Sequence, residues 1–260
     1  MTLPVMPLLE LLQTYLWPLI RISGFLVALP AIGGAFVPAR VRAMLAIVLT
    51  LVIAPVIPSA GPPTAIFSLA GAVLAVQEAV LGLIMGFVVQ LVFDAITLGA
   101  QTISMSMGLG FAVFIDRVTG VNVPVIGQLY LMLTLLLFLA VDGHLALIRL
   151  LFDSFSAAPV GMFYLDQADA GAVLTWSSQL VVGAIRIALP AVTTLLVVNL
   201  SFGVMRRAAP SMNLFAVGFP ISMMLGFAVL YISIDVIDQA FSTLFPMSLE
   251  VIRDLTLRSP

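Results

Sequence analysis

The chain contains no cysteine and only one histidine, His144. Without cysteine there is no disulfide bond, no thiolate metal site and no thiol nucleophile. A single histidine with no cysteine nearby cannot supply the ligands of a typical zinc site. The Gly-x-Ser-x-Gly pattern of serine hydrolases, a glycine-rich phosphate loop and a basic patch for nucleic acid are missing as well. We therefore expect no catalytic activity, no cofactor or metal, and no nucleic-acid partner.

Charged side chains are also scarce. They make up 8% of the 260 residues, whereas 62% are hydrophobic and the mean hydropathy is +1.25. Soluble proteins carry about 25% charged residues, and a membrane-spanning helix needs about 20 apolar ones. The composition therefore predicts an all-α, polytopic integral membrane protein of about six long, partly kinked hydrophobic helices arranged in hairpins.

Proline, glycine and polar residues divide the chain into six apolar segments. The second segment is short for a membrane crossing, and an amphiphilic connection over residues 142–169 separates the fourth from the fifth. The segments cover residues 5–29, 43–57, 66–98, 123–141, 171–204 and 214–245.

One stretch, residues 108–127, is rich in glycine and polar residues although apolar segments surround it. Irregular backbone at membrane depth must be shielded by protein or line an aqueous passage, so a pore, a plug or a substrate site is expected here. Met105 and Met107 add flexible apolar side chains at its start. Such side chains suit a deformable hydrophobic constriction that excludes water, although ordinary helix packing would use them too.

Several ionisable residues interrupt the apolar segments. Each costs about 2.5–3.5 kcal/mol at the centre of a membrane helix, so each is a candidate for function. A transporter would use them as a proton or ion relay; alternatively, Arg21 or Arg186 forms a buried ion pair with Glu78 or Asp94. The six residues are Arg21, Glu78, Asp94, Arg186, Asp235 and Asp238.

Short motifs distributed over nearly the whole chain carry a family resemblance. They are 17–21 (WPLIR), 37–42 (VPARVR), 107–116 (MGLGFAVFID), 123–128 (VPVIGQ), 142–144 (DGH), 188–190 (ALP), 199–203 (NLSFG) and 212–220 (MNLFAVGFP). In order and spacing, the set resembles the FliR/SctT family of type III secretion export-gate subunits.

The resemblance implies a core subunit of the flagellar export gate in the bacterial inner membrane, within the flagellar basal body. One copy would assemble with FliP and FliQ into a channel for unfolded flagellar proteins, with FlhB and FlhA as neighbours. It also implies two parts: residues 1–170, similar to FliP, and residues 171–260, a hairpin and tail similar to FliQ.

The family's pore-closing loop matches residues 105–122 here. The resemblance assigns the plug to Met105, Met107, Gly108, Leu109, Gly110, Phe111, Phe114 and Asp116. Asp116 is followed by Arg117, where the family often has proline. The turn at Arg206 and Arg207 corresponds to the tip of the C-terminal hairpin and is a candidate contact for FlhB or for the cytoplasmic export machinery. Alternatively, the two charges serve only to orient the chain in the membrane.

Two alternatives remain open from the sequence. An independent proton- or ion-coupled secondary transporter would use Glu78, Asp94 and Arg186 as coupling residues. A subunit of a virulence secretion system would share the gating mechanism and differ in its cargo.

Overall fold

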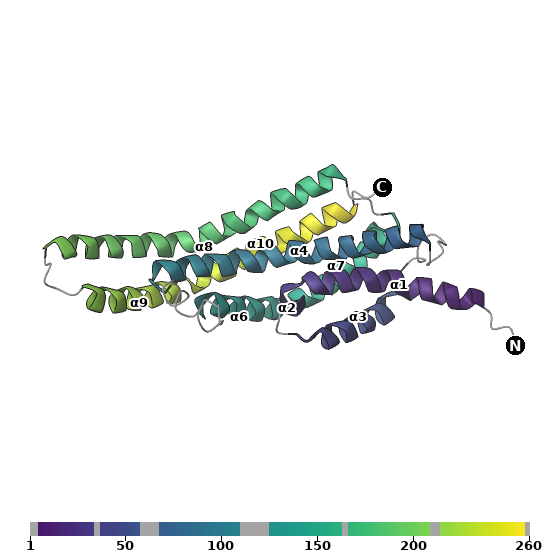
Figure 1. Ribbon diagram of the computed structural model, residues 1–260, viewed down its shortest axis with the longest axis horizontal. Coiled ribbons are helices and arrows are strands. Elements are labelled where there is room, and N and C mark those ends of the chain that lie inside the picture. Colours follow the sequence, from purple (N-terminus) through teal and green to yellow (C-terminus); the bar gives the residue numbers. More distant parts are fainter. Residues whose placement is uncertain are drawn as a thin grey trace. The chain divides into compact units, whose positions relative to one another are not determined.

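The computed structural model describes residues 5–33, 37–57, 68–109, 125–162, 166–208 and 214–257. Over these residues the chain is helical and contains no β-strand (Figure 1). The prediction of an all-α protein is confirmed. The helices are α1 (Val5–Ala28), α2 (Pro30–Gly33), α3 (Ala39–Ile53), α4 (Leu69–Ser106), α6 (Val125–Ala140), α7 (Gly143–Ala157), α8 (Gln167–Ala208), α9 (Leu214–Ile232) and α10 (Ile234–Leu257).

Two of these helices are long and apolar enough to cross a membrane by themselves, α4 and the Gln167–Met205 part of α8. Two bent pairs qualify when each is taken as one span: α6 with α7, which meet at 69°, and Pro220–Ile232 with α10, which meet at 47°. The described residues therefore supply two spans, or up to four, and confirm a polytopic membrane protein. By contrast, α3 has 15 residues and a length of about 22 Å, shorter than the hydrocarbon core.

The connection expected over residues 142–169 contains a helix, α7. Its buried residues Leu147, Leu150, Leu151 and Phe155 recur at helical spacing, so one face is apolar enough to pack. Asp142 has a left-handed backbone conformation, with φ of 55°. It lies between α6 and α7, where the chain bends by 69°. An amphipathic helix therefore replaces the predicted connection.

The sixth apolar segment also differs from its prediction. It forms two helices that meet at Ser233, and the second continues to Leu257, well beyond residue 245. Glu250 and Arg253 are exposed, whereas Ile252 and Leu255 are buried, so this end is amphipathic. The prediction ended this segment at residue 245 because the charges that follow lower the mean hydropathy. In the structure these charges occupy only the exposed face of the helix, so the helix continues.

The chain divides into two compact units that alternate along the sequence. The first comprises Met1–Leu91, Val141–Ser177 and Phe245–Pro260; the second comprises Val92–Ala140 and Ser178–Leu244. Helices α4, α8 and α10 each contribute one part to each unit. The predicted boundary at residue 170 concerns similarity to FliP and FliQ and stays a prediction.

In the first unit, α1 packs closely on α4. A Cβ atom at Gly86 would lie 2.6 Å from the Phe25 carbonyl oxygen, and one at Gly82 would collide with the Arg21 carbonyl oxygen. Glycine is required at both positions because two helix backbones meet there. Trp176 at the start of α8 donates a 3.0 Å hydrogen bond to the Val88 carbonyl oxygen.

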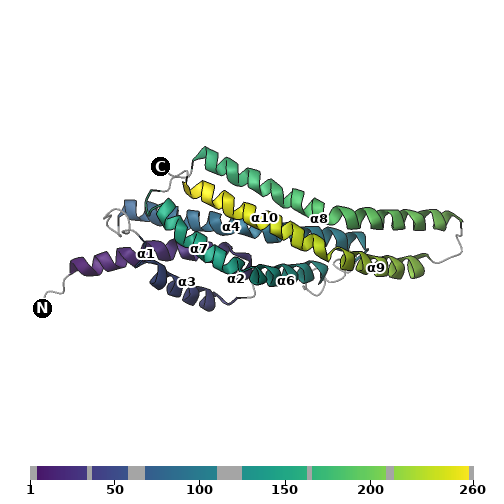
Figure 2. The same ribbon diagram turned by 180° about the vertical axis from the view of Figure 1, so that it is seen from behind.

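In the second unit, three aromatic rings join α4, α6 and α10. Phe93 makes edge-to-face contacts with Phe138 and Phe241, with ring centroids 5.7 Å and 6.0 Å apart. A Cβ atom at Gly183 of α8 would lie 3.3 Å from Ala95 Cβ and 3.1 Å from Leu244 Cδ1, so α8 approaches both α4 and α10. The course of α8 and α10 is seen from behind in Figure 2.

Candidate functional site

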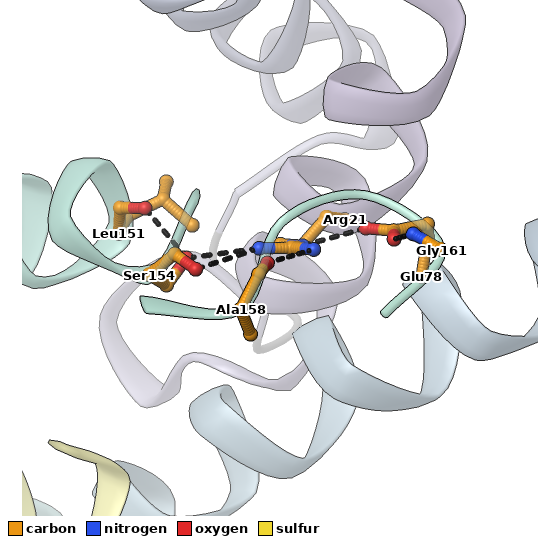
Figure 3. Close-up of polar contacts among 6 residues, drawn as sticks. All are labelled: Arg21, Glu78, Leu151, Ser154, Ala158 and Gly161. Carbon is orange, nitrogen blue, oxygen red and sulfur yellow. Dashed lines mark hydrogen bonds and ion pairs between the residues drawn. The ribbon is translucent and has the colours of Figure 1, made fainter. Parts of the chain in front are cut away.

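A buried ion pair joins α1 to α4. Arg21 Nε lies 2.6 Å from Glu78 Oε2, and both side chains are fully buried (Figure 3). Arg21 also donates to the carbonyl oxygens of Ser154, at 3.0 Å, and Ala158, at 2.9 Å. Glu78 Oε1 accepts a 3.3 Å hydrogen bond from the Gly161 backbone N–H. Both charges are thus satisfied within the first unit.

The partners of Arg21 lie at the end of α7. The carbonyl groups at the C-terminal end of a helix carry the negative end of its dipole, so they attract a guanidinium. The Ser154 carbonyl oxygen also accepts the Ala158 backbone N–H at 2.9 Å. The Phe155 ring adds a cation–π contact, with its centroid 4.3 Å from Arg21 Cζ. Arg21 therefore joins three elements: α1, α4 and the end of α7.

The other two ion-pair candidates have different environments. Asp94 is half-buried on α4, whereas Arg186 is exposed on α8. Within the second unit, the described residues give Arg186 no ion pair and no hydrogen bond. The single chain does not bury Arg186, because Gly183, Ala184 and Ile187 form the packed face of α8 and Arg186 lies beside that face. Asp235 and Asp238 on α10 are exposed as well.

The candidate gate loop begins where α4 ends, and a Schellman motif produces that end. The N–H of Leu109 donates to the Ser104 carbonyl oxygen at 3.2 Å, and that of Gly108 to the Met105 carbonyl oxygen at 3.1 Å. Gly108 has φ of 85°, a left-handed conformation that glycine adopts without steric cost. Gly108 therefore terminates α4 at the start of the loop.

The two methionines at this helix end differ in exposure. Met105 is 70% exposed, whereas Met107 is fully buried. A Cβ atom at Gly226 of α9 would lie 2.5 Å from Met107 Cγ and Cε and 2.8 Å from Sδ. The absence of a side chain at Gly226 thus leaves the space that Met107 occupies.

Polar contacts reinforce this helix end. Asn199 of α8 donates through Nδ2 to the Ser106 carbonyl oxygen at 3.5 Å. The Ser222 hydroxyl of α9 donates to Asn199 Oδ1 at 3.3 Å. The sequence places Asn199 in the motif over residues 199–203 but assigned no role to it, and it gave no indication for Ser222 or Gly226.

The remaining predicted positions are only partly described. Leu109 is half-buried and is the last residue of the loop that the structure describes. Gly110, Phe111, Phe114 and Asp116 lie outside the described residues. Arg206 and Arg207 belong to the last turn of α8; Arg207 is exposed, and the side chain of Arg206 lies outside the described part of the chain.

Comparison with known proteins identifies the family. Residues 12–247 match the model of the bacterial export proteins, family 1. The chain belongs to this family. Several relatives are named flagellar biosynthetic protein FliR. The one from Escherichia coli K12 is 35% identical over 253 residues, which cover 96% of each chain.

Two further FliR proteins match over a similar length. The FliR protein of Pectobacterium carotovorum is 33% identical over 252 residues, covering 93% of this chain and 94% of the relative. The FliR protein of Bacillus subtilis is 29% identical over 251 residues, covering 95% of this chain and 96% of the relative. The resemblance to FliR that the sequence motifs indicate is confirmed.

Proposed function

We propose that this chain is a core subunit of the flagellar type III export gate in the bacterial inner membrane. One copy assembles with FliP and FliQ into the channel through which unfolded flagellar proteins leave the cytoplasm. The observation that carries the proposal is the match of residues 12–247 to a bacterial export family, together with relatives named flagellar biosynthetic proteins. The long apolar helices α4 and α8 support a place in the membrane.

The proposed gate is the loop over residues 105–122, which closes the channel at rest and rearranges when a substrate engages. Gly108 supports this role because it ends α4 sharply, and Met105 supports it because its side chain is exposed at that end. Flexible apolar side chains exclude water from a narrow passage without requiring hydrogen bonds. Met107, which packs on Gly226, anchors the start of the loop.

The transporter alternative gains no support from the ion-pair geometry. A coupling carboxylate must exchange protons or ions, but both oxygens of Glu78 already accept hydrogen bonds, and its side chain has no exposed surface. We assign the pair a structural role. The exposed Arg207, with Arg206 beside it in the chain, remains the proposed contact for FlhB, and FlhA is a further proposed neighbour.

The proposal is tested by deleting the gene for this chain in its own bacterium. We expect the deletion strain to secrete no flagellar filament protein into the medium, while the cytoplasmic amount of that protein stays measurable by immunoblotting. Reintroducing the gene restores secretion. Normal secretion by the deletion strain would contradict the proposal.

A further inference from the structure

The second unit contains a groove between α8 and α10 with a cationic side chain in its wall. Its volume is about 220 Å³. The polar residues that line it are Gln179 and Arg186 from α8 and Gln239 and Thr243 from α10. The course of the two helices is visible in Figure 2.

Arg186 is the only charge in a long apolar stretch of α8. The neighbouring charges along the helix, Asp169 and Arg206, are about 26 Å and 30 Å away at helical rise. No described residue of its own unit forms an ion pair or hydrogen bond with Arg186. A cation in such a position needs an anionic partner, because apolar surroundings do not solvate it. The described residues of the second unit do not supply that partner, whereas another subunit of the proposed gate can.

We propose that the groove receives an aspartate or glutamate from a helix of another subunit and that Arg186 pairs with this carboxylate. The inference rests on the proposed function, since a hetero-oligomeric gate supplies the second subunit. It goes further in naming a contact surface and the chemistry of the group that fits it.

The donors in the groove match a carboxylate. The Thr243 hydroxyl already donates to the Gln239 carbonyl oxygen at 2.8 Å. The donors left for a bound anion are therefore the Arg186 guanidinium and the side-chain amides of Gln179 and Gln239. A guanidinium holds a carboxylate through two parallel hydrogen bonds, and the amides complete the shell around its oxygens.

The surroundings favour a protein carboxylate over a lipid phosphate. Ile185 and Leu189, close to Arg186 on α8, are exposed apolar side chains. A helix with one acidic residue among apolar ones would pair its carboxylate with Arg186 and cover the apolar side chains of Ile185 and Leu189.

The first experiment measures subunit retention. The tagged chain is co-expressed with FliP and FliQ, purified in mild detergent, and the retained subunits are quantified by native mass spectrometry. We expect Arg186→Gln to lower retention by at least about tenfold, because loss of one partner leaves a desolvated carboxylate unpaired. Arg253→Gln, at another exposed arginine on α10, serves as the matched control and retains both subunits.

The outcomes separate the two proposals. If the wild-type chain retains neither FliP nor FliQ, the proposed gate assembly fails, and the inference fails with it. If the wild-type complex forms and Arg186→Gln retains as much partner as wild type, the assembly stands and only the inference is overturned.

The second experiment identifies the occupant. A photo-reactive amino acid replaces Gln239 in the full chain, and cross-linked peptides are mapped after irradiation of intact cells. We expect a peptide from another subunit that contains an aspartate or glutamate. Arg186→Glu combined with that acid changed to arginine should restore the retention that Arg186→Glu alone abolishes. Cross-links to lipid alone, or no restoration by the charge exchange, would overturn the inference.

Discussion

At the scale of single residues, the Arg21–Glu78 pair sets the strongest requirement on the first unit. Both charges are fully buried, and each has further hydrogen bonds to backbone groups of residues 154–161. A buried ion pair of this kind adds little net stability relative to apolar residues, but removing one partner leaves the other charge uncompensated. The pair is therefore sensitive to single substitutions and tolerant of a matched double one.

Glu78→Ala is expected to lower the free energy of unfolding by about 3–5 kcal/mol, because it leaves the Arg21 guanidinium buried without a counter-charge. The measurement is denaturant-induced unfolding of the purified full chain in detergent. Fluorescence of the buried Trp17 and Trp176 reports the transition.

Two variants control this prediction. Glu250→Ala removes an exposed carboxylate of α10, and its effect should stay within about 0.5 kcal/mol. The double variant Arg21→Met with Glu78→Met should recover most of the lost stability, since no buried charge remains. A Glu78→Ala protein as stable as the Glu250→Ala protein would show that the pair carries no such requirement.

The sequence named Arg21 and Glu78 as candidates but could not choose between the possible partners. The two residues are 57 positions apart, and which of the charges meet depends on how each helix is rotated in the packed unit. Arg186 shows the same limit: its burial was expected because its neighbours are apolar, but small residues fill the packed face beside it. The role of Gly226 could not be predicted, because hydropathy does not show that Met107 packs against a glycine of another helix.

At the scale of secondary-structure elements, the end of α4 is anchored to α9. Met107 fills the space above Gly226, and Asn199 and Ser222 connect the same turn to α8 and α9. The start of the proposed gate loop is therefore held by helix packing, while the exposed Met105 lies free of that packing.

Gly226→Val should displace Met107 and release the last turn of α4, because the new side chain would occupy the space of the thioether. Since the natural chain has no cysteine, a single Ser104→Cys substitution provides a clean reporter. Ser104 is buried in this turn, so its thiol should react with maleimide at least about tenfold more slowly than an exposed one. Gly226→Val should abolish that protection.

Met105→Cys provides the reference for this measurement. Its thiol is exposed and should react rapidly whether residue 226 is glycine or valine. If Ser104→Cys stays protected in the Gly226→Val protein, contact between α9 and Met107 does not hold the end of α4.

Helix existence could be predicted better than helix shape. The apolar segments at 5–29, 43–57, 66–98, 123–141 and 171–204 each correspond to one helix, because the apolar content of each is high throughout. Residues 142–169 and 246–257 were missed because α7 and the end of α10 are amphipathic, with charges on their exposed face. The bends of 69° and 47° depend on single backbone positions such as Asp142, which hydropathy does not register.

At the scale of the whole molecule, the chain exposes more apolar surface than a self-sufficient protein would. The apolar window of α4 is 61% buried, but that of α8 is only 33% buried. Exposed apolar residues also line α3, including Met44, Ile47, Val48, Leu51 and Val52. Such surfaces require a cover of lipid or of other subunits. An assembled export gate would supply both.

The composition of the complex tests the proposed gate assembly most directly. The tagged chain is co-expressed with FliP and FliQ, purified in mild detergent and analysed by native mass spectrometry. We expect a discrete hetero-oligomer that contains both partners and a single copy of this chain. A stable monomer or homodimer that leaves FliP and FliQ behind would contradict the assembly.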